Sequence, residues 1–437
     1  MAEVSFICKR TALSNKPVQP GTFSPLSVLD HVMERNNLRI VFYYQLPARR
    51  KPGEITKKLR ESISEMLSAF PVAIGRLLKN PEGQWTIKCN DAGLRIVEAR
   101  VKGSLDEWLK NVHREKELKL VHWEEMFEKP YFWSTFYVQI TEFEYGGLAI
   151  GLSCTHLLSD PASATVMIKA WADTTLRGKI ISPPLFHPLP LRRPGNTNPD
   201  HQPYSNLINH YKSAILNSSP VSHVKQTTIT LQFNQEMVKS CMAMAELSQT
   251  PFLALAALFW TCVSKAKGVK GGLIDMSICL DRRKVLGLDK GFFGNCMVYN
   301  KVHGDGLDEN EVSKAAIAIN EVVSRIDRDG VTDLIEWLEK RENCEDPPWM
   351  NGCDLICVNL EDVDSYSAVF EGNASPVRVS YYIEPSVGPG QVVILPSPSG
   401  DGPLSRVVSV TLPEDEAEKL LDDAIIKKFD PTILMGF

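Results

Sequence analysis

The sequence has no excess of basic residues. Lys and Arg number 48 among 437 residues, against 53 Asp and Glu, which gives a formal net charge of −5 at pH 7. Proteins that bind the phosphate backbone of nucleic acids rely on clustered positive charge. We therefore expect no nucleic-acid partner.

Cysteines are few, and none of them stands in a Cys-x-x-Cys pair. Ten cysteines are spread over the 437 residues, which predicts buried thiols in a reducing compartment rather than a disulfide framework. Cys353 and Cys357 are nearest to each other, but a zinc site needs two further ligands, and none stands out near them. We expect no metal site.

The chain also lacks the apolar segments that mark secreted and membrane proteins. No basic stretch followed by an apolar one opens the sequence, so no secretory signal is predicted. The longest uncharged apolar run, 250–264, is shorter than the roughly 20 residues that a membrane helix needs. These absences predict a cytoplasmic protein without a membrane span.

What is present is an ordinary globular composition, with 43% apolar and 23% charged residues. A length of 437 residues suits two or three domains. Prolines repeatedly interrupt the pattern between 177 and 226, where they break any helix or central strand. We therefore predict an N-terminal domain at 1–176 and a C-terminal domain at 227–437, joined by a proline-rich crossover at 177–226.

Hydrophobic periodicity predicts a mixture of helices and strands in both halves of the chain. Helices are predicted at 54–70, 105–118, 235–249, 251–265, 308–328 and 331–340. Strands are predicted at 85–89, 95–99, 133–141, 148–155, 227–232, 273–280, 354–358, 368–370, 377–383, 391–396 and 405–412. The strands at 133–141 and 148–155 flank a turn with two glycines and are expected to pair as a hairpin.

One histidine stands where a strand gives way to a helix. His156 directly follows the strand 148–155, and helical spacing resumes after Asp160 and Pro161. A strand end that opens into a loop holds a side chain at a rigid point. With an ordinary pKa of about 6.5, His156 would accept a proton from a hydroxyl or an amine. A hydrogen-bonded core histidine is the alternative, and Asp160 before Pro161 is also the pattern of a helix N-cap.

Several stretches together resemble one enzyme family. GLSCTHLLSD at 151–160 places His156 and Asp160 in a His-x-x-x-Asp motif. Three further resemblances are FPVAIGRL at 70–77, LFWTCVSKAKG at 258–268, and DRR at 281–283 followed by GFFGN at 291–295. This set resembles the BAHD acyltransferases, plant enzymes that move an acyl group from coenzyme A to an alcohol or an amine.

The resemblance implies a fold and a division of roles. The fold would be α/β, of the chloramphenicol acetyltransferase type, with two domains that each hold a mixed β-sheet flanked by helices and with an active-site channel at their interface. His156 would be the general base, and Asp160 would turn away to pair with Arg283 and shape the site. The protein would be a monomer whose partners are acyl-CoA and a small-molecule acceptor, and it would need no cofactor beyond acyl-CoA as co-substrate.

The end of the helix at 251–265 is a candidate site for acyl-CoA. Ser264, Lys265, Lys267 and Lys270 stand in a glycine-rich cationic turn that suits the phosphates of coenzyme A. A solvated helix end would show the same pattern, and no glycine-rich nucleotide fingerprint competes elsewhere. On the resemblance, Asn295 of GFFGN is assigned to the same acyl-CoA site.

The last quarter of the chain departs from the family. The Asp-Phe-Gly-Trp-Gly motif should fall near 381–385, where this chain reads YYIEP. KCNDAGLRIVEA at 88–99, QITEF at 139–143, GPGQVVILP at 388–396 and RVVSV at 406–410 resemble the eceriferum branch of the family, which also lacks that motif. This second resemblance implies a different function, as a non-catalytic partner of the fatty acid elongase and its condensing enzyme at the endoplasmic reticulum, in very-long-chain fatty acid and cuticular wax synthesis.

Overall fold

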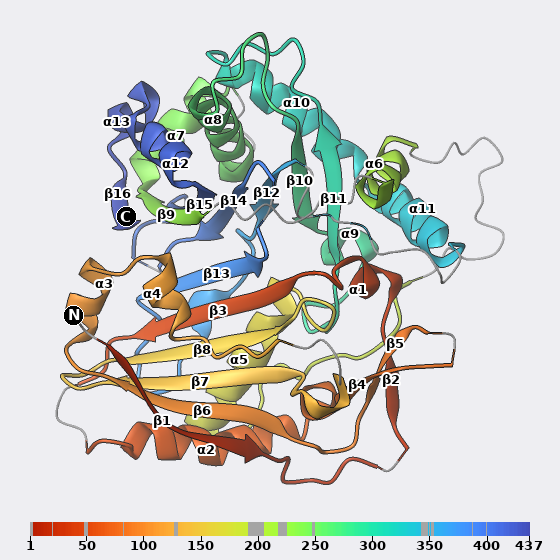
Figure 1. Ribbon diagram of the computed structural model, residues 1–437, viewed down its shortest axis with the longest axis vertical. Helices are drawn as coiled ribbons and strands as arrows, with labels where there is room; N and C mark the ends of the chain where they lie inside the picture. Colours follow the sequence, from red (N-terminus) through yellow and green to blue (C-terminus); the bar gives the residue numbers. More distant parts are fainter. Residues whose placement is uncertain are drawn as a thin grey trace. The chain divides into compact units, whose positions relative to one another are not determined.

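A computed structural model of the chain forms two compact units (Figure 1). It describes residues 3–19, 21–47, 51–81, 83–125, 130–190, 205–216, 225–246, 250–341, 348, 350, 354–386, 388–398 and 400–437. The first unit comprises Met1–Pro188, Asp289–Asn295 and Asp364–Glu384, and the second comprises Leu189–Leu288, Cys296–Val363 and Pro385–Phe437.

The division into units differs from the predicted boundaries at two segments. The sequence places all of 227–437 in the C-terminal domain, whereas the structure assigns 289–295 and 364–384 to the first unit. The physical reason is strand pairing and backbone hydrogen bonding over long sequence distances. The strand at 378–384 pairs with the strand at 37–44, and the Leu185 N–H donates to the carbonyl of Gly291 over 2.8 Å.

The first unit is built on a six-stranded mixed sheet. In spatial order its strands are β1 (Val4–Ala12), β6 (Leu94–Val101), β7 (Phe136–Phe143), β8 (Leu148–Thr155), β3 (Asn37–Tyr44) and β13 (Arg378–Glu384). Only β6 and β7 are parallel neighbours, and β7 and β8 form the predicted hairpin. A small sheet of β2 (Phe23–Pro25), β5 (Trp85–Lys88) and β4 (Arg76–Lys79) lies beside it.

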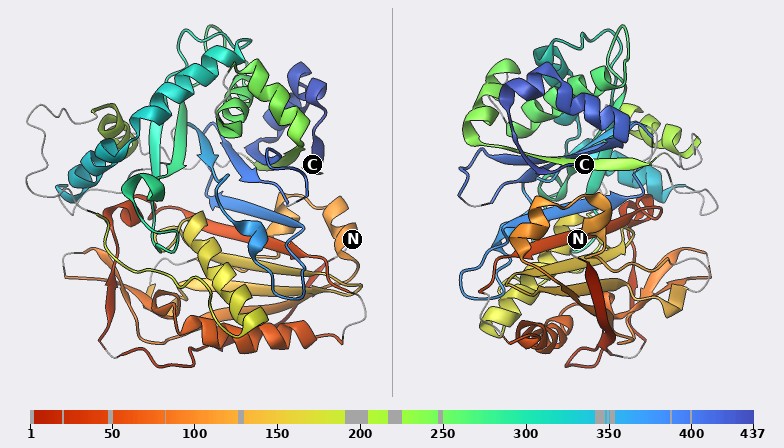
Figure 2. Two further views of the ribbon diagram at one scale, coloured as in Figure 1. Left: turned by 180° about the vertical axis from the view of Figure 1, so that it is seen from behind. Right: turned by 60° about the vertical axis from the view of Figure 1, so that its left-hand side comes forward.

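Helices cover both faces of the six-stranded sheet. They are α1 (Val28–Val32), α2 (Glu54–Leu67), α3 (Leu105–Lys110), α4 (Arg114–Leu118) and α5 (Pro161–Arg177), with short 3₁₀ turns at Pro71–Ile74, Pro130–Phe132 and Ser365–Ser367. Figure 2 shows α2 and α5 together on one face, and α3 and α4 lie toward the other face in Figure 1. The chain after α4 crosses that second face closely, because a Cβ atom built on Gly151 of β8 would stand 2.1 Å from the carbonyl oxygen of Leu120.

The second unit is built on a seven-stranded sheet. In spatial order its strands are β11 (Met297–Val302), β10 (Met276–Asp281), β12 (Leu355–Asn359), β14 (Gln391–Pro396), β15 (Arg406–Pro413), β9 (Gln226–Phe233) and β16 (Thr432–Met435). Its helices are α6 (Ser205–Leu216), α7 (Gln235–Met244), α8 (Pro251–Ala266), α9 (Arg283–Leu286), α10 (Val312–Arg325), α11 (Arg328–Glu339), α12 (Glu414–Asp422) and α13 (Ala424–Phe429). Helix α8 is apolar on every side because α7, α10, α12 and the sheet surround it.

Most predicted elements are confirmed, and the exceptions have local causes. The helix predicted at 105–118 is two helices, because Asn111 ends α3 and His113 begins α4. The strand predicted at 368–370 was wrong, since this stretch is irregular although Ala368 and Phe370 are buried. The predicted crossover contains helix α6, while its residues 191–204 and 217–224 lie outside the described part of the chain.

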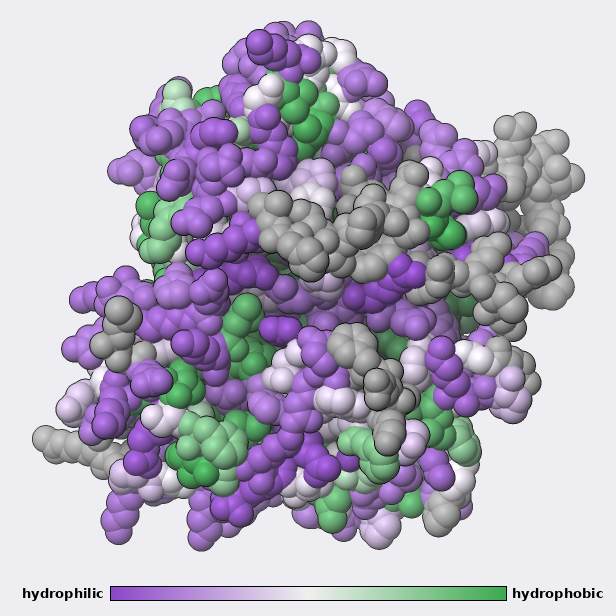
Figure 3. Space-filling view, viewed as in Figure 1, coloured by the Kyte–Doolittle hydropathy of each residue, from purple (hydrophilic) through white to green (hydrophobic). Residues whose placement is uncertain are grey.

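Figure 3 shows that the viewed face is mostly hydrophilic, with separate apolar patches. Within the described ranges, no helix is both long enough and apolar enough to cross a bilayer.

Candidate active site

His156 follows the last residue of β8, as the sequence predicts. Its backbone N–H donates to the carbonyl of Asn36 over 2.8 Å, which ties it to the start of β3. The side chain is fully buried, with 0% of its surface exposed. Neither Nδ1 nor Nε2 has a hydrogen-bond partner among the described residues. The backbone at His156 is therefore fixed, while both ring nitrogens are buried without a hydrogen-bond partner among the described residues.

Burial sets the charge of this imidazole. The cost of desolvating a cation lowers the pKa of His156 below its ordinary value. The carboxylates of Asp160 and Asp30 oppose this shift but do not overcome it. His156 is therefore neutral near pH 7, which is the form that accepts a proton.

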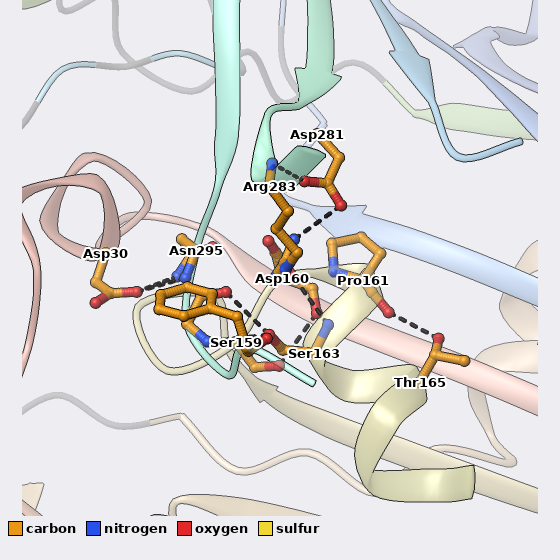
Figure 4. A network of polar contacts seen from close by, with 11 residues as sticks. Asp30, Ser159, Asp160, Pro161, Ser163, Thr165, Asp281, Arg283 and Asn295 are labelled. Carbon is orange, nitrogen blue, oxygen red and sulfur yellow. Dashed lines mark hydrogen bonds and ion pairs between the residues drawn. The ribbon is translucent and has the colours of Figure 1, made fainter. Parts of the chain in front are cut away.

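Asn295 fixes the backbone at His156. Its side-chain Nδ2 donates to Oδ1 of Asp30 over 2.8 Å (Figure 4). The same nitrogen donates to the carbonyl of His156 over 2.8 Å. The backbone N–H of Asn295 also donates to Oδ1 of Asp30 over 2.8 Å. The Oδ1 atom of Asn295 is buried and has no partner among the described residues, so it is a further acceptor at this site.

Asp30 is a site residue that sequence reasoning missed. It lies in α1 and forms a capping box with Ser27, whose Oγ accepts from the Asp30 N–H while Oδ2 of Asp30 accepts from the Ser27 N–H. Burial raises the pKa of Asp30, although the donors from Asn295 and Ser27 oppose that shift. The Ser-x-x-Asp spacing at 27–30 predicts the start of a helix, but no local pattern predicts that the same carboxylate holds Asn295.

Asp160 caps helix α5, which is the structural role that its neighbour Pro161 indicates. Its Oδ1 accepts from the Ser163 N–H over 2.9 Å, and its side chain is fully buried. The hydroxyl of Ser163 in turn donates to the Gly294 carbonyl over 2.9 Å and accepts from the Gly294 N–H over 3.0 Å. The Phe-Gly-Asn segment is thus bonded to the first turn of the helix that follows His156.

Arg283 begins α9 in the second unit. Its backbone N–H and its guanidinium donate to the two carboxylate oxygens of Asp281, each over 2.9 Å. Asp160 belongs to the first unit. The pairing of Asp160 with Arg283 stays a prediction.

The residues assigned to acyl-CoA fall into two groups. Ser264 is buried, and its hydroxyl accepts from the Ile274 N–H over 3.2 Å, so it closes the turn after α8. Lys265 is half-buried, Lys267 is ion-paired with Glu416, and Lys270 is exposed. Asn295 belongs to the first unit and bonds His156, as described above. A role for any of them in binding acyl-CoA stays a prediction.

Comparison with known proteins places these features in a family. The model of the Transferase family matches residues 2–425. The chain is 27% identical over 425 residues to Protein ECERIFERUM 26-like of Arabidopsis thaliana, covering 94% of this chain and 92% of that protein. It is 29% identical over 378 residues to Rosmarinate synthase of Plectranthus scutellarioides, covering 83% of this chain and 85% of that enzyme.

The fold agrees with a solved structure over its whole length. The crystal structure of Vinorine Synthase superposes with a TM-score of 0.75 at 19% identity, covering 99% of this chain and 100% of that chain. The predicted fold of the chloramphenicol acetyltransferase type, with two mixed sheets flanked by helices, is confirmed. Because the family model spans nearly all of the sequence, the chain belongs to the Transferase family, that of the BAHD acyltransferases.

Proposed function

We propose that the protein transfers an acyl group from acyl-CoA to the hydroxyl or amine of a plant specialised metabolite, with His156 as the general base. One observation carries the proposal: a fully buried imidazole at a strand end, with neither ring nitrogen hydrogen-bonded among the described residues and with a lowered pKa. A merely structural histidine buried to this extent would use its ring nitrogens in hydrogen bonds.

The proposed reaction needs only one proton acceptor. His156 takes the proton of the acceptor O–H or N–H as the oxygen or nitrogen attacks the thioester carbonyl. The C–S bond of the resulting tetrahedral intermediate then breaks, and the imidazolium returns the proton to the departing thiolate, which leaves as coenzyme A. No acyl-enzyme forms in this scheme.

The neighbouring residues support this role without taking part in bond breaking. Asn295 bonds the His156 carbonyl, and Asn36 accepts its backbone N–H, so the imidazole is fixed before substrate arrives. The turn at Lys265, Lys267 and Lys270 is the proposed contact for coenzyme A phosphates, and Lys267 would have to exchange its ion pair with Glu416 to take part. We propose a monomer acting in the cytoplasm.

A second function is favoured by a specific observation. The chain aligns with Protein ECERIFERUM 26-like over 94% of its length, and at 381–385 it reads YYIEP instead of the usual family motif. Under this alternative the protein is a non-catalytic partner of the elongase condensing enzyme and acts at the endoplasmic reticulum. The channel that the family resemblance implies would then guide an acyl chain, and no acyl transfer would take place in it.

The two functions predict different products. Purified protein is incubated with a panel of acyl-CoA thioesters and pooled plant alcohols and amines, and free thiol is measured. The enzyme proposal expects thiol release that depends on an acceptor. The partner proposal expects none, together with longer fatty acids when the chain is co-expressed with a condensing enzyme in yeast. Absence of thiol release with every pairing, alongside such a chain-length shift, would overturn the enzyme proposal.

A further inference from the structure

Glu117 is a buried carboxylate that the proposed reaction does not use. It lies in α4, with 0% of its surface exposed. It accepts hydrogen bonds from the hydroxyls of Tyr43 over 2.8 Å, of Ser380 over 3.0 Å and of Tyr382. The guanidinium of Arg378 lies 3.5 Å from its Oε1. A buried carboxylate is costly unless it is paired and hydrogen-bonded, and this one is both.

The partners of Glu117 keep their protons. Burial, together with the adjacent Glu117 carboxylate, raises the pKa of Tyr43 and of Tyr382, so both remain hydroxyl donors. The same carboxylate raises the pKa of Arg378, so the guanidinium remains a cation. The indole of Trp108 in α3 also donates to Tyr43 over 3.3 Å. The two tyrosines therefore remain hydrogen-bond donors to Glu117 near pH 7, and Arg378 remains a cation beside it.

Three of these partners come from one strand. Arg378, Ser380 and Tyr382 alternate along β13, so a period of two places them on one face of the sheet. Among the strands that the structure describes, β13 lies at the edge of its sheet, next to β3. Glu117 thus binds helix α4 to this edge strand.

The opposite face of β13 is bonded as well. The hydroxyl of Tyr381 lies 2.8 Å from Oγ1 of Thr165 and 2.8 Å from Oγ of Ser365. Thr165 stands in the second turn of α5, the helix that Asp160 caps. Adjacent tyrosines therefore bond β13 to α4 on one face and to α5 on the other.

The end of β13 leads to His156. Arg114 of α4 pairs with Glu384 over 2.6 Å. Glu384 stands opposite Asn37 of β3, and Asn37 stands opposite Thr155 of β8. Thr155 directly precedes His156. The backbone N–H of His156 donates to the carbonyl of Asn36, which directly precedes Asn37. A continuous set of ion pairs and strand pairings thus connects α4 to the backbone of His156.

We propose that Glu117 is a positioning residue for His156 and that it acts by holding β13 in place. The segment it holds contains Tyr381 and Tyr382, where the family motif is absent from this chain. The effect on turnover rests on the proposed acyl transfer, whereas the effect on the position of His156 does not.

The test compares variants that weaken the hydrogen bonds of Glu117 with a variant that lowers the stability of the protein by a similar amount elsewhere. Glu117→Gln removes the charge and keeps the shape, and Tyr382→Phe removes one hydroxyl donor. Leu59→Ala is the matched control, because Leu59 is a fully buried residue of α2 outside the cluster. Unfolding in denaturant ranks the three variants by stability, and Tyr382→Phe carries the test if Glu117→Gln does not fold.

Turnover is the first measurement. A shift of about 1 Å in a reacting group costs on the order of 100-fold in rate. We expect Glu117→Gln to lower kcat by about 10- to 100-fold with little change in KM, and Leu59→Ala to leave kcat nearly unchanged. Equal kcat values for the two variants at equal stability would overturn the proposal.

The pKa of the His156 imidazole is the second measurement and needs no turnover. It is followed by NMR on histidine-labelled protein, with the signal assigned by its loss in His156→Ala. We expect Glu117→Gln to move this pKa upward, toward the ordinary value of about 6.5, because a loosened strand admits water. Leu59→Ala should leave it unchanged. If the pKa of His156 shifts in Glu117→Gln but neither the wild type nor any variant releases thiol, the positioning role is supported and acyl transfer is contradicted. If the pKa of His156 does not shift, the positioning role itself is overturned.

Discussion

The end of β8 and the turn after α8 carry residues to which the proposed acyl transfer assigns roles, but the two places differ in how those residues are held. At the end of β8, His156, Asp160 and Asn295 are all fully buried, and hydrogen bonds fix the backbone around them. In the turn after α8, Lys270 is exposed, and Lys267 is paired with Glu416. Changes at the first place should therefore alter chemistry and folding, and changes at the second should alter only binding.

The physical basis of this difference is the dielectric environment. Charges and dipoles interact strongly where water is excluded, and they cost little to hold if their geometry is set during folding. Exposed ammonium groups are screened by salt and water, so each contributes little. Substitutions are therefore expected to have their largest effect on activity at His156 and their smallest effect at the exposed lysines.

Replacing His156 should have the largest effect. His156→Ala removes the proton acceptor and should lower thiol release by about 10²- to 10⁴-fold while the protein stays folded, because the ring has no hydrogen bonds to lose. His113→Ala is the control, since His113 is exposed and makes no capping bond with its side chain. If His156→Ala releases thiol as fast as the wild type, His156 is not the general base of the reaction. If the protein is an elongase partner, the chain-length shift should survive this substitution.

Replacing Asp160 separates its two roles. Asp160→Asn keeps a capping oxygen and removes the charge, whereas Asp160→Ala removes both. If Asp160 pairs with Arg283, both variants should lose about 3 kcal/mol of unfolding free energy and much of their activity. Asp327→Ala is the matched control, because Asp327 caps α11 and its loss should cost about 1 kcal/mol. If Asp160→Asn has the stability and activity of the wild type, helix capping is the only role left for Asp160, and the pairing with Arg283 is contradicted.

Acidification should weaken the buried site first. Because burial lowers the pKa of His156, the unfolded chain binds its proton at a higher pH than the folded chain does. This contribution to stability is present above about pH 6.5 and is lost as the pH falls below that value, by up to about 1.4 kcal/mol per pH unit. The rate of thiol release should be constant from pH 8 to pH 6.5. It should fall at lower pH, where His156 becomes protonated.

The histidine at position 210 must be separated from this effect, since burial also lowers its pKa, to about 4. Unfolding curves of the wild type and of His156→Ala, taken from pH 8 to pH 5, isolate the contribution of His156. Parallel curves for the two proteins would show that His156 titrates alike in the folded and unfolded chains, and that burial does not set its pKa.

Replacing an exposed lysine should have the smallest effect. Lys270→Ala should raise KM for acyl-CoA by about two- to fivefold without changing kcat, because a screened surface charge contributes up to about 1 kcal/mol. The effect should shrink as salt is added. Lys239→Ala, on the exposed face of α7, serves as the control. Equal KM values for the wild type, Lys270→Ala and Lys239→Ala would show that Lys270 does not contribute to binding acyl-CoA.

The local features of the buried site could be predicted from the sequence. A continuous apolar run ends at His156, and Asp160 before Pro161 marks a helix start, so the strand, the histidine and the cap follow from short-range patterns. The resemblance to the family supplied the role proposed for the histidine and singled out Asn295, whose assignment to acyl-CoA stays a prediction.

The long-range partners could not be predicted in this way. Asp30 bonds Asn295 across 265 positions of sequence, and Glu117 bonds Tyr382 across an equal separation. Such contacts depend on which strands become neighbours, and periodicity within a strand carries no information about its partner. For the same reason, the inclusion of 364–384 in the first unit became visible only once β13 was seen to pair with β3.

The close approach at Gly151 has an evolutionary consequence. Even the single carbon of an alanine would meet the Leu120 carbonyl oxygen at 2.1 Å, so the strand that ends at His156 and the chain that follows α4 can diverge only together. A library of random variants selected for folding should retain the glycine codon at 151 while many neighbouring codons drift. Any lineage that replaced this glycine would also have had to move the backbone at Leu120 and Val121, which follows closely after Glu117.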